Sequence, residues 1–177
     1  KKYSLEEIKP YIDWTYFFHA WELKGKYPEI LDHPERGKES RKLFKDAQEF
    51  LDRIIRDEIL DARAVFTVLP ANARDDDIEV YADEKRDRVL TVFNMLRSQS
   101  DKTVTGDNRS LADYIAPVES GIPDYIGVFA VSAGFGMDKW VTGLDSRNDD
   151  YQIIMLKTLA DRLVEALNRA FASAGKK

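Results

Sequence analysis

Apolar residues recur at three- and four-residue spacing in two long segments, which is the period of an amphipathic helix. The first segment runs from about Glu39 to Leu60, with its apolar positions at Leu43, Ala47, Phe50, Leu51, Ile54 and Ile55. The second begins near Asp149 and carries two adjacent rows, Tyr151, Met155, Leu159, Leu163, Ala166 and Ala170 beside Leu156, Ala160, Leu163, Leu167 and Phe171. So wide an apolar stripe predicts a long C-terminal helix that is largely buried.

Short runs of β-branched and aromatic residues predict strands. The run from Ala64 to Leu69 is closed by Pro70 and predicts a buried strand. The runs from Ile78 to Tyr81 and from Val89 to Phe93 flank the charged stretch Asp83 to Arg88. This layout predicts two antiparallel strands joined by a solvated hairpin loop.

A fourth strand is predicted from Tyr125 to Val131, followed by a turn at Gly134 and Gly136 and a short helix around Asp138 to Leu144. The elements together predict an α+β fold, a mainly antiparallel sheet with flanking helices and a long C-terminal helix. Near the start of the chain, Ser4 followed by Glu7 predicts a capping box that opens a short helix limited by Pro10.

The segment from Tyr11 to Trp21 is unusually aromatic. It reads Tyr-Ile-Asp-Trp-Thr-Tyr-Phe-Phe-His-Ala-Trp, six aromatic residues and one histidine in eleven positions, with the single carboxylate Asp13. A carboxylate among apolar neighbours must be capped or paired, because an unpaired buried charge is costly. Asp13 suits the N-cap of a helix beginning at Trp14. It also suits an ammonium or sulfonium ligand that the aromatic faces contact through cation–π interactions. The residues alone favour the cap.

Glu165 carries a similar ambiguity. It lies among the polar positions of the last helix, and Arg169 is placed at i+4 for an ordinary surface ion pair.

Composition narrows the classes of function. The 177 residues are 44% hydrophobic and 11% aromatic, which suits one domain with a continuous core. The net charge of -5 leaves no basic patch for nucleic acid. No stretch is apolar enough to span a membrane, and the start lacks a secretory signal, so we expect a soluble cytoplasmic protein. The absence of cysteine excludes disulfides, thiolate nucleophiles and cysteine-based zinc sites.

Several short motifs are better explained by structure than by chemistry. The turn at Gly134 and Gly136 lacks the third glycine of a dinucleotide fingerprint, because Lys139 stands at that position. The stretch from Asp75 to Asp77 lacks the spacing of a calcium loop and is typical of a solvated acidic loop. His19 and His33 have no partner at metal-ligand spacing, and no serine-nucleophile elbow is present, so we expect neither a metal site nor a catalytic residue.

Five ordered blocks of the sequence carry a family resemblance. They are Asp13 to Phe18 with Trp21 to Pro28, Leu69 to Asn72 with Asp76 to Tyr81, Leu111 to Pro117, Asp124 to Val131, and Asp149 to Tyr151 with Leu159 to Leu163. Over nearly the whole chain, these blocks resemble the S-adenosylmethionine-binding activation domain of cobalamin-dependent methionine synthase, a methyltransferase. The family usually carries proline where Tyr16 stands.

The resemblance implies a role in the reductive reactivation of cob(II)alamin, with S-adenosylmethionine as methyl donor. It implies two partners, the cobalamin-binding module of the same enzyme and flavodoxin or a similar electron donor. By this resemblance, Asp13 matches the family aspartate that contacts S-adenosylmethionine through its positively charged amino acid portion. Glu165 matches a glutamate on the family's long helix near the same site.

The chain also departs from the family. Family members continue beyond the long helix into an arginine-proline-alanine-proline-glycine-tyrosine stretch and a later tyrosine, which hold the adenosine and the carboxylate. This sequence ends before either, and the resemblance fades from Asn168. We therefore expect residues 1–177 to be the N-terminal half of one activation domain, inactive and without tight S-adenosylmethionine binding when isolated. The alternative is a non-catalytic stand-alone scaffold that binds a corrinoid protein or a flavodoxin-like partner, and a nucleotide-binding enzyme ranks last.

Overall fold

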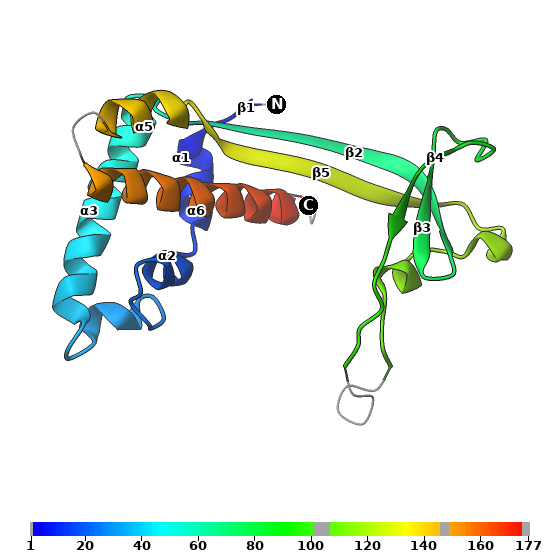
Figure 1. Ribbon diagram of the computed structural model, residues 1–177, viewed down its shortest axis with the longest axis horizontal. Coiled ribbons are helices and arrows are strands. Elements are labelled where there is room, and N and C mark those ends of the chain that lie inside the picture. Colours follow the sequence, from blue (N-terminus) through cyan, green and yellow to red (C-terminus); the bar gives the residue numbers. More distant parts are fainter. Residues whose placement is uncertain (1, 101–106, 146–148, 175–177) are drawn as a thin grey trace. The chain divides into compact units, whose positions relative to one another are not determined.

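The computed structural model describes residues 2–100, 107–145 and 149–174 (Figure 1). The chain divides into two compact units. Unit 1 takes its residues from Lys1–Val65 and Ala130–Lys177, and unit 2 comprises Phe66–Phe129. Helices dominate the first unit and strands dominate the second.

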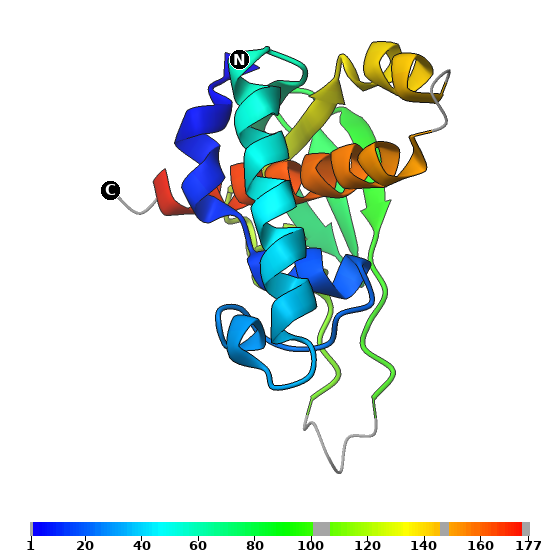
Figure 2. The same cartoon turned by 90° about the vertical axis from the view of Figure 1, so that its left-hand side faces the viewer.

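Helix α6, Asp150–Ala174, is the centre of unit 1. The other helices of the unit contact it, namely α1 (Leu5–Ile8), the 3₁₀ helix η1 (Lys9–Tyr11), α2 (Trp14–Ala20), α3 (Gly37–Arg56) and α5 (Met137–Asp145). Figure 2 shows α3, in cyan, crossing α6, in orange. A further 3₁₀ helix, η2 (Glu29–Asp32), precedes α3. The predicted long C-terminal helix is thus confirmed.

The predicted apolar rows of α6 form much of the unit 1 core. Its buried apolar side chains are Met155, Leu156, Leu159, Ala160, Leu163, Ala166 and Leu167. Tyr151, at the first turn of the helix, is 44% exposed, and Ala170 is partly buried. The side chain of Phe171 lies outside the described residues.

Helix α3 confirms the first predicted helix, although it begins at Gly37 rather than Glu39 and ends at Arg56 rather than Leu60. Its start depends on Gly37, where an added Cβ would lie 2.5 Å from the carbonyl oxygen of Leu31. No such separation occurs between real atoms of these kinds, so glycine permits the close approach that begins the helix.

The sheet has the order β1-β2-β3-β4, and β5 also pairs with β2. The strands are β1 (Lys2–Tyr3), β2 (Asp61–Arg74), β3 (Asp77–Tyr81), β4 (Val89–Asn94) and β5 (Asp124–Phe135). Each of the pairs β1/β2, β2/β3 and β3/β4 is antiparallel. The observed fold is therefore the predicted α+β class with a mainly antiparallel sheet.

The prediction of a buried strand from Ala64 to Leu69 was wrong in two respects. Strand β2 continues through Pro70 to Arg74, and its middle is exposed, with Val65 at 64%, Phe66 at 59% and Val68 at 53%. Alternate side chains of a strand face opposite sides, so exposure of Val65, Phe66 and Val68 means that both faces are open here. Burial resumes at Pro70, and the buried Ala71 and Ala73 belong to the small apolar cluster of unit 2.

The loop between β3 and β4 confirms the predicted hairpin, but one of its charged residues is not solvated. The guanidinium of Arg86 donates to the carbonyl oxygens of Ala71 and Asp124 at 3.1 and 2.8 Å, and to Asn72 Oδ1 at 2.7 Å. It also lies over the rings of Tyr81 and Tyr125. Arg86 thus connects β2, the hairpin and β5 within unit 2. Periodicity could not reveal this role, because it depends on acceptors remote in sequence.

The predicted capping box at Ser4 is absent, since Ser4 precedes α1 but makes no side-chain cap hydrogen bond. A capping box occurs instead at Ser110 and Asp113, around the 3₁₀ helix η3 (Leu111–Tyr114), and η4 (Val118–Ser120) follows it. Among the described residues, no helix is both long and apolar enough to cross a membrane.

Candidate functional site

Asp13 is the N-cap of α2. Its backbone is extended, with φ -87° and ψ 100°, and its Oδ1 accepts a hydrogen bond from the Thr15 N–H at 3.0 Å. Thr15 Oγ1 accepts in turn from the Tyr27 N–H at 3.2 Å. The cap predicted from the sequence is therefore present, and it fixes the orientation of the carboxylate.

The second carboxylate oxygen of Asp13 has a distant partner. Arg169 Nη2, on α6, donates to Asp13 Oδ2 at 2.7 Å across a sequence separation of 156 residues. The same nitrogen donates to Glu165 Oε1 at 2.8 Å, which is the predicted i+4 ion pair. One guanidinium therefore brings together the two residues that the sequence selected, Asp13 and Glu165.

A second arginine extends this group of charges. Arg162 Nη1 lies 2.5 Å from Glu165 Oε2, and its guanidinium lies 5.8 Å from the centre of the Tyr16 ring. Asp13, Arg169, Glu165 and Arg162 are hereafter called the charge chain. Its charges alternate in sign along the series, so each member has an opposite charge beside it.

The electrostatic surroundings keep Asp13 ionised. Burial raises the pKa of its carboxyl group, but hydrogen bonds from the Arg169 guanidinium and the Thr15 N–H act in the opposite direction. The net pKa lies below its usual value. At neutral pH the residue is therefore a carboxylate, able to balance a positive charge.

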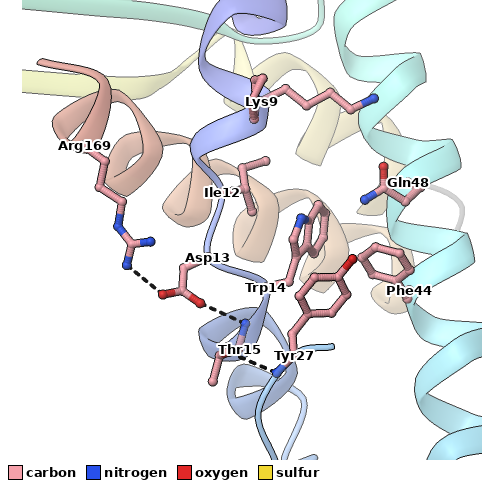
Figure 3. Close-up of a pocket in the computed structure, with 10 residues that line it drawn as sticks. Lys9, Ile12, Asp13, Trp14, Thr15, Tyr27, Phe44, Gln48 and Arg169 are labelled. Atoms are coloured by element: carbon pink, nitrogen blue, oxygen red, sulfur yellow. Dashed lines mark hydrogen bonds and ion pairs between the residues drawn. The ribbon is translucent and has the colours of Figure 1, made fainter. Parts of the chain in front are cut away.

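A pocket of about 820 Å³ opens beside this carboxylate (Figure 3). It is lined by Lys9, Pro10, Ile12, Asp13, Trp14, Thr15, Tyr27, Phe44, Gln48 and Arg169. Three aromatic rings pack together in its wall, with Phe44 4.9 Å from Trp14 and 5.2 Å from Tyr27 between ring centres. An ionised carboxylate beside aromatic rings is an arrangement that accepts organic cations.

Sequence reasoning missed several residues of this site. It paired Arg169 with Glu165 alone, and it assigned no role to Tyr27, Phe44 or Gln48. These residues approach Asp13 through tertiary packing, so no local spacing signals them. The aromatic density of the segment from Tyr11 to Trp21 was the one usable signal, because it marked Trp14 as part of a core or a ligand wall.

The turn after β5 has a structural explanation. Gly136 has φ +97°, and a Cβ there would lie 2.5 Å from the carbonyl oxygen of Ile59. Gly134 lies within β5, which ends at Phe135 and so later than predicted. A Cβ on Gly134 would meet nothing closer than Met137 Cε at 3.8 Å. Backbone packing therefore accounts for Gly136 without a bound phosphate.

The remaining polar motifs have partners within the fold. Asp76 pairs with Arg97 at 2.5 Å, and Asp77 accepts from the Met95 N–H at 3.1 Å. His33 Nδ1 accepts from the N–H groups of Glu35 and Arg36 before α3. Within residues 2–100, 107–145 and 149–174, no group of three or more histidine or carboxylate side chains is arranged to hold a metal ion.

Comparison with known proteins finds a matching family and similar solved structures. The family model described as "Vitamin B12 dependent methionine synthase, activation domain" matches residues 4–174. The match extends past Asn168, where the sequence suggested that the resemblance fades. A solved structure, the MetH reactivation domain bound to AdoHcy, is 46% identical and superposes with a TM-score of 0.87. The alignment covers 95% of this chain and 51% of that one, so this chain spans about half its length.

Proposed function

This chain belongs to the family of activation domains of vitamin B12-dependent methionine synthases, and on that premise we propose that it forms part of an S-adenosylmethionine-binding module. The module serves reductive reactivation of cob(II)alamin in a methyltransferase that makes methionine. S-adenosylmethionine, when bound, supplies the methyl group, and flavodoxin or a similar donor supplies the electron. The cobalamin is carried by a neighbouring module, and the enzyme works in the cytoplasm. The described chain belongs to a single activation domain.

Asp13 is the observation that carries the proposal. Its carboxylate is ionised and held in a fixed direction by the Thr15 N–H, and it opens onto a pocket with an aromatic wall. These properties fit the cationic amino acid portion of S-adenosylmethionine, because a carboxylate balances the charge while the rings exclude water. The similar reactivation domain was crystallised with AdoHcy, which has the same amino acid portion.

Glu165 belongs to the same site in this proposal. It lies within hydrogen-bonding distance of Arg169, whose other partner is Asp13, so it acts within one charged group with the aspartate. The protein contributes binding and orientation, since the methyl transfer depends on the ligands themselves.

The isolated chain supplies one part of the ligand site. Asp13 and its pocket fit the cationic end of the ligand, whereas the match covers only 51% of the related domain. We expect the remaining part of that domain to contact the adenosine, so the isolated chain is inactive and binds S-adenosylmethionine weakly.

Titration calorimetry with S-adenosylmethionine tests the proposal on three proteins. The first is this chain, and the second, called the extended protein, joins it to the part of the solved reactivation domain beyond the aligned region. The third is the extended protein with Asp13→Ala. We expect negligible heat from the first, saturable binding by the second and weaker binding by the third.

Two outcomes would contradict the proposal. Micromolar binding by the chain alone would show that no further part of the domain is needed. Absence of binding by a folded extended protein would favour the alternative function, a non-catalytic scaffold for a corrinoid protein or a flavodoxin-like partner.

A further inference from the structure

Arg169 has two carboxylate partners, and this sets it apart within the charge chain. Its Nη2 atom lies 2.7 Å from Asp13 Oδ2 and 2.8 Å from Glu165 Oε1. Its side chain is 42% exposed, so water reaches the guanidinium and the pairs exchange readily. Arg169 can therefore leave either carboxylate and keep the other.

Both oxygens of Asp13 are already used. Oδ1 accepts from the Thr15 N–H as the helix cap, and Oδ2 accepts from Arg169. Figure 3 shows Arg169 extending from α6 to this second oxygen. A cationic ligand that approaches Oδ2 meets a guanidinium of the same charge, and two cations at one carboxylate oxygen repel each other.

Glu165 makes the exchange feasible. If Arg169 releases Asp13, it retains the Glu165 carboxylate, and the ligand cation takes its place at Asp13. No charge is then left unpaired, which avoids the penalty for a buried single charge. Glu165 keeps Arg162 as a second partner at 2.5 Å in either state.

We propose that Arg169 is a built-in competitor of the ligand cation, occupying the Asp13 carboxylate until the ligand displaces it onto Glu165. This inference rests on the proposed function and adds a regulatory step to the same site. It changes the role expected of Glu165, which becomes a positioning residue that receives Arg169. Removing the Arg169 charge therefore strengthens binding of a cation at Asp13.

The test uses this chain and a probe that needs no adenosine site. S-methylmethionine carries an ammonium and a sulfonium group and is titrated while the carboxyl carbon of Asp13 is followed by NMR. We expect Arg169→Gln to bind the probe about two- to fivefold more tightly than the unchanged chain, the range set by loss of one partly exposed ion pair. Arg88→Gln is the matched control, because it removes the same charge from an exposed residue outside the charge chain, and its affinity for the probe should equal that of the unchanged chain.

Three results would overturn the inference. Equal or weaker binding by Arg169→Gln would mean that Arg169 does not compete, or that it helps to hold the probe. An equal gain in affinity for Arg88→Gln would assign the effect to overall charge. If the Asp13 signal shifted in neither the unchanged chain nor Arg169→Gln, Asp13 would not be a binding site for the cation. The proposed function is judged separately, by S-adenosylmethionine binding to the extended protein.

Discussion

The two carboxylate oxygens of Asp13 have different partners and different origins in the sequence. The bond to the Thr15 N–H is local, and the position of Asp13 before Trp14 predicted it. The bond to Arg169 joins residues 156 positions apart, and only the packing of α2 against α6 creates it. Local chemistry therefore predicted the cap, whereas the ion pair depends on tertiary structure.

The pH dependence of the free energy of unfolding distinguishes the contribution of the Asp13 helix cap from that of its carboxylate charge. The pKa of Asp13 is lowered in the folded protein, so its charge stabilises the fold above the unfolded pKa of about 3.9. That stabilisation is lost as the pH falls through the folded pKa. Asp13→Asn keeps a good N-cap but has no charge. In urea unfolding, we expect this variant to be less stable than the unchanged chain at pH 7, and we expect the difference to be smaller at about pH 2.5, below the unfolded pKa.

Asp13→Ala serves as the control, because it removes both interactions. It should cost about 0.5–2 kcal/mol at pH 7, the usual range for loss of an N-cap. If the stability difference between Asp13→Asn and the unchanged chain were the same at both pH values, the ion pair with Arg169 would contribute nothing.

The close approach of Gly136 to the Ile59 carbonyl predicts the stability of two glycine variants. Gly136→Ala places a methyl group against the Ile59 carbonyl at a positive φ, so we expect a loss of roughly 1–3 kcal/mol. Gly134→Ala has room for its methyl group and should change stability by less than about 1 kcal/mol. Thermal unfolding of the two variants measures the contrast. Equal losses would mean that the close approach to Ile59 does not constrain the turn.

Among the helices and strands, those predicted from helical periodicity agree best with the structure. The wide stripe of α6 predicted a central helix because a face so apolar must contact several partners, and five other helical segments contact it. The burial predicted for the β2 segment from its apolar run was wrong. An apolar run of β-branched residues predicts burial only if both faces are covered, and Val65, Phe66 and Val68 each remain more than half exposed.

Arg86 gives the prediction for the β3/β4 hairpin. Its side chain is only 16% exposed, and its guanidinium satisfies acceptors on Ala71, Asn72 and Asp124. Arg86→Met keeps much of the volume but leaves these acceptors unpaired, at about 1–3 kcal/mol for each one that water cannot reach. We expect a clear fall in the urea midpoint of unfolding.

Arg88→Met is the matched control in the same loop, because Arg88 is exposed. Its midpoint should stay within the range typical of surface substitutions, about 0.5 kcal/mol. A similar midpoint for both variants would mean that Arg86, like Arg88, contributes little to stability and that the whole stretch from Asp83 to Arg88 behaves as a solvated loop.

The strands of unit 2 expose many large apolar side chains. Large apolar side chains that are more than two-fifths exposed occur along its strands, namely Phe66, Val68, Val89, Leu90, Val92, Tyr125 and Phe129. Soluble proteins rarely leave so much apolar surface open without a partner. The related reactivation domain contains about as much chain again beyond the aligned region. Exposed apolar side chains in this number are typical of a surface that contacts another segment or protein.

In the proposed function, the Asp13 carboxylate holds the cationic end of S-adenosylmethionine. Calorimetry on the extended protein and its Asp13→Asn variant tests it most directly, because asparagine preserves the cap of α2 while removing the charge. We predict an affinity at least about tenfold weaker in the variant, the usual effect of losing a charged hydrogen bond. Equal affinities of the two proteins for S-adenosylmethionine would contradict the claim and leave Asp13 as a helix cap alone.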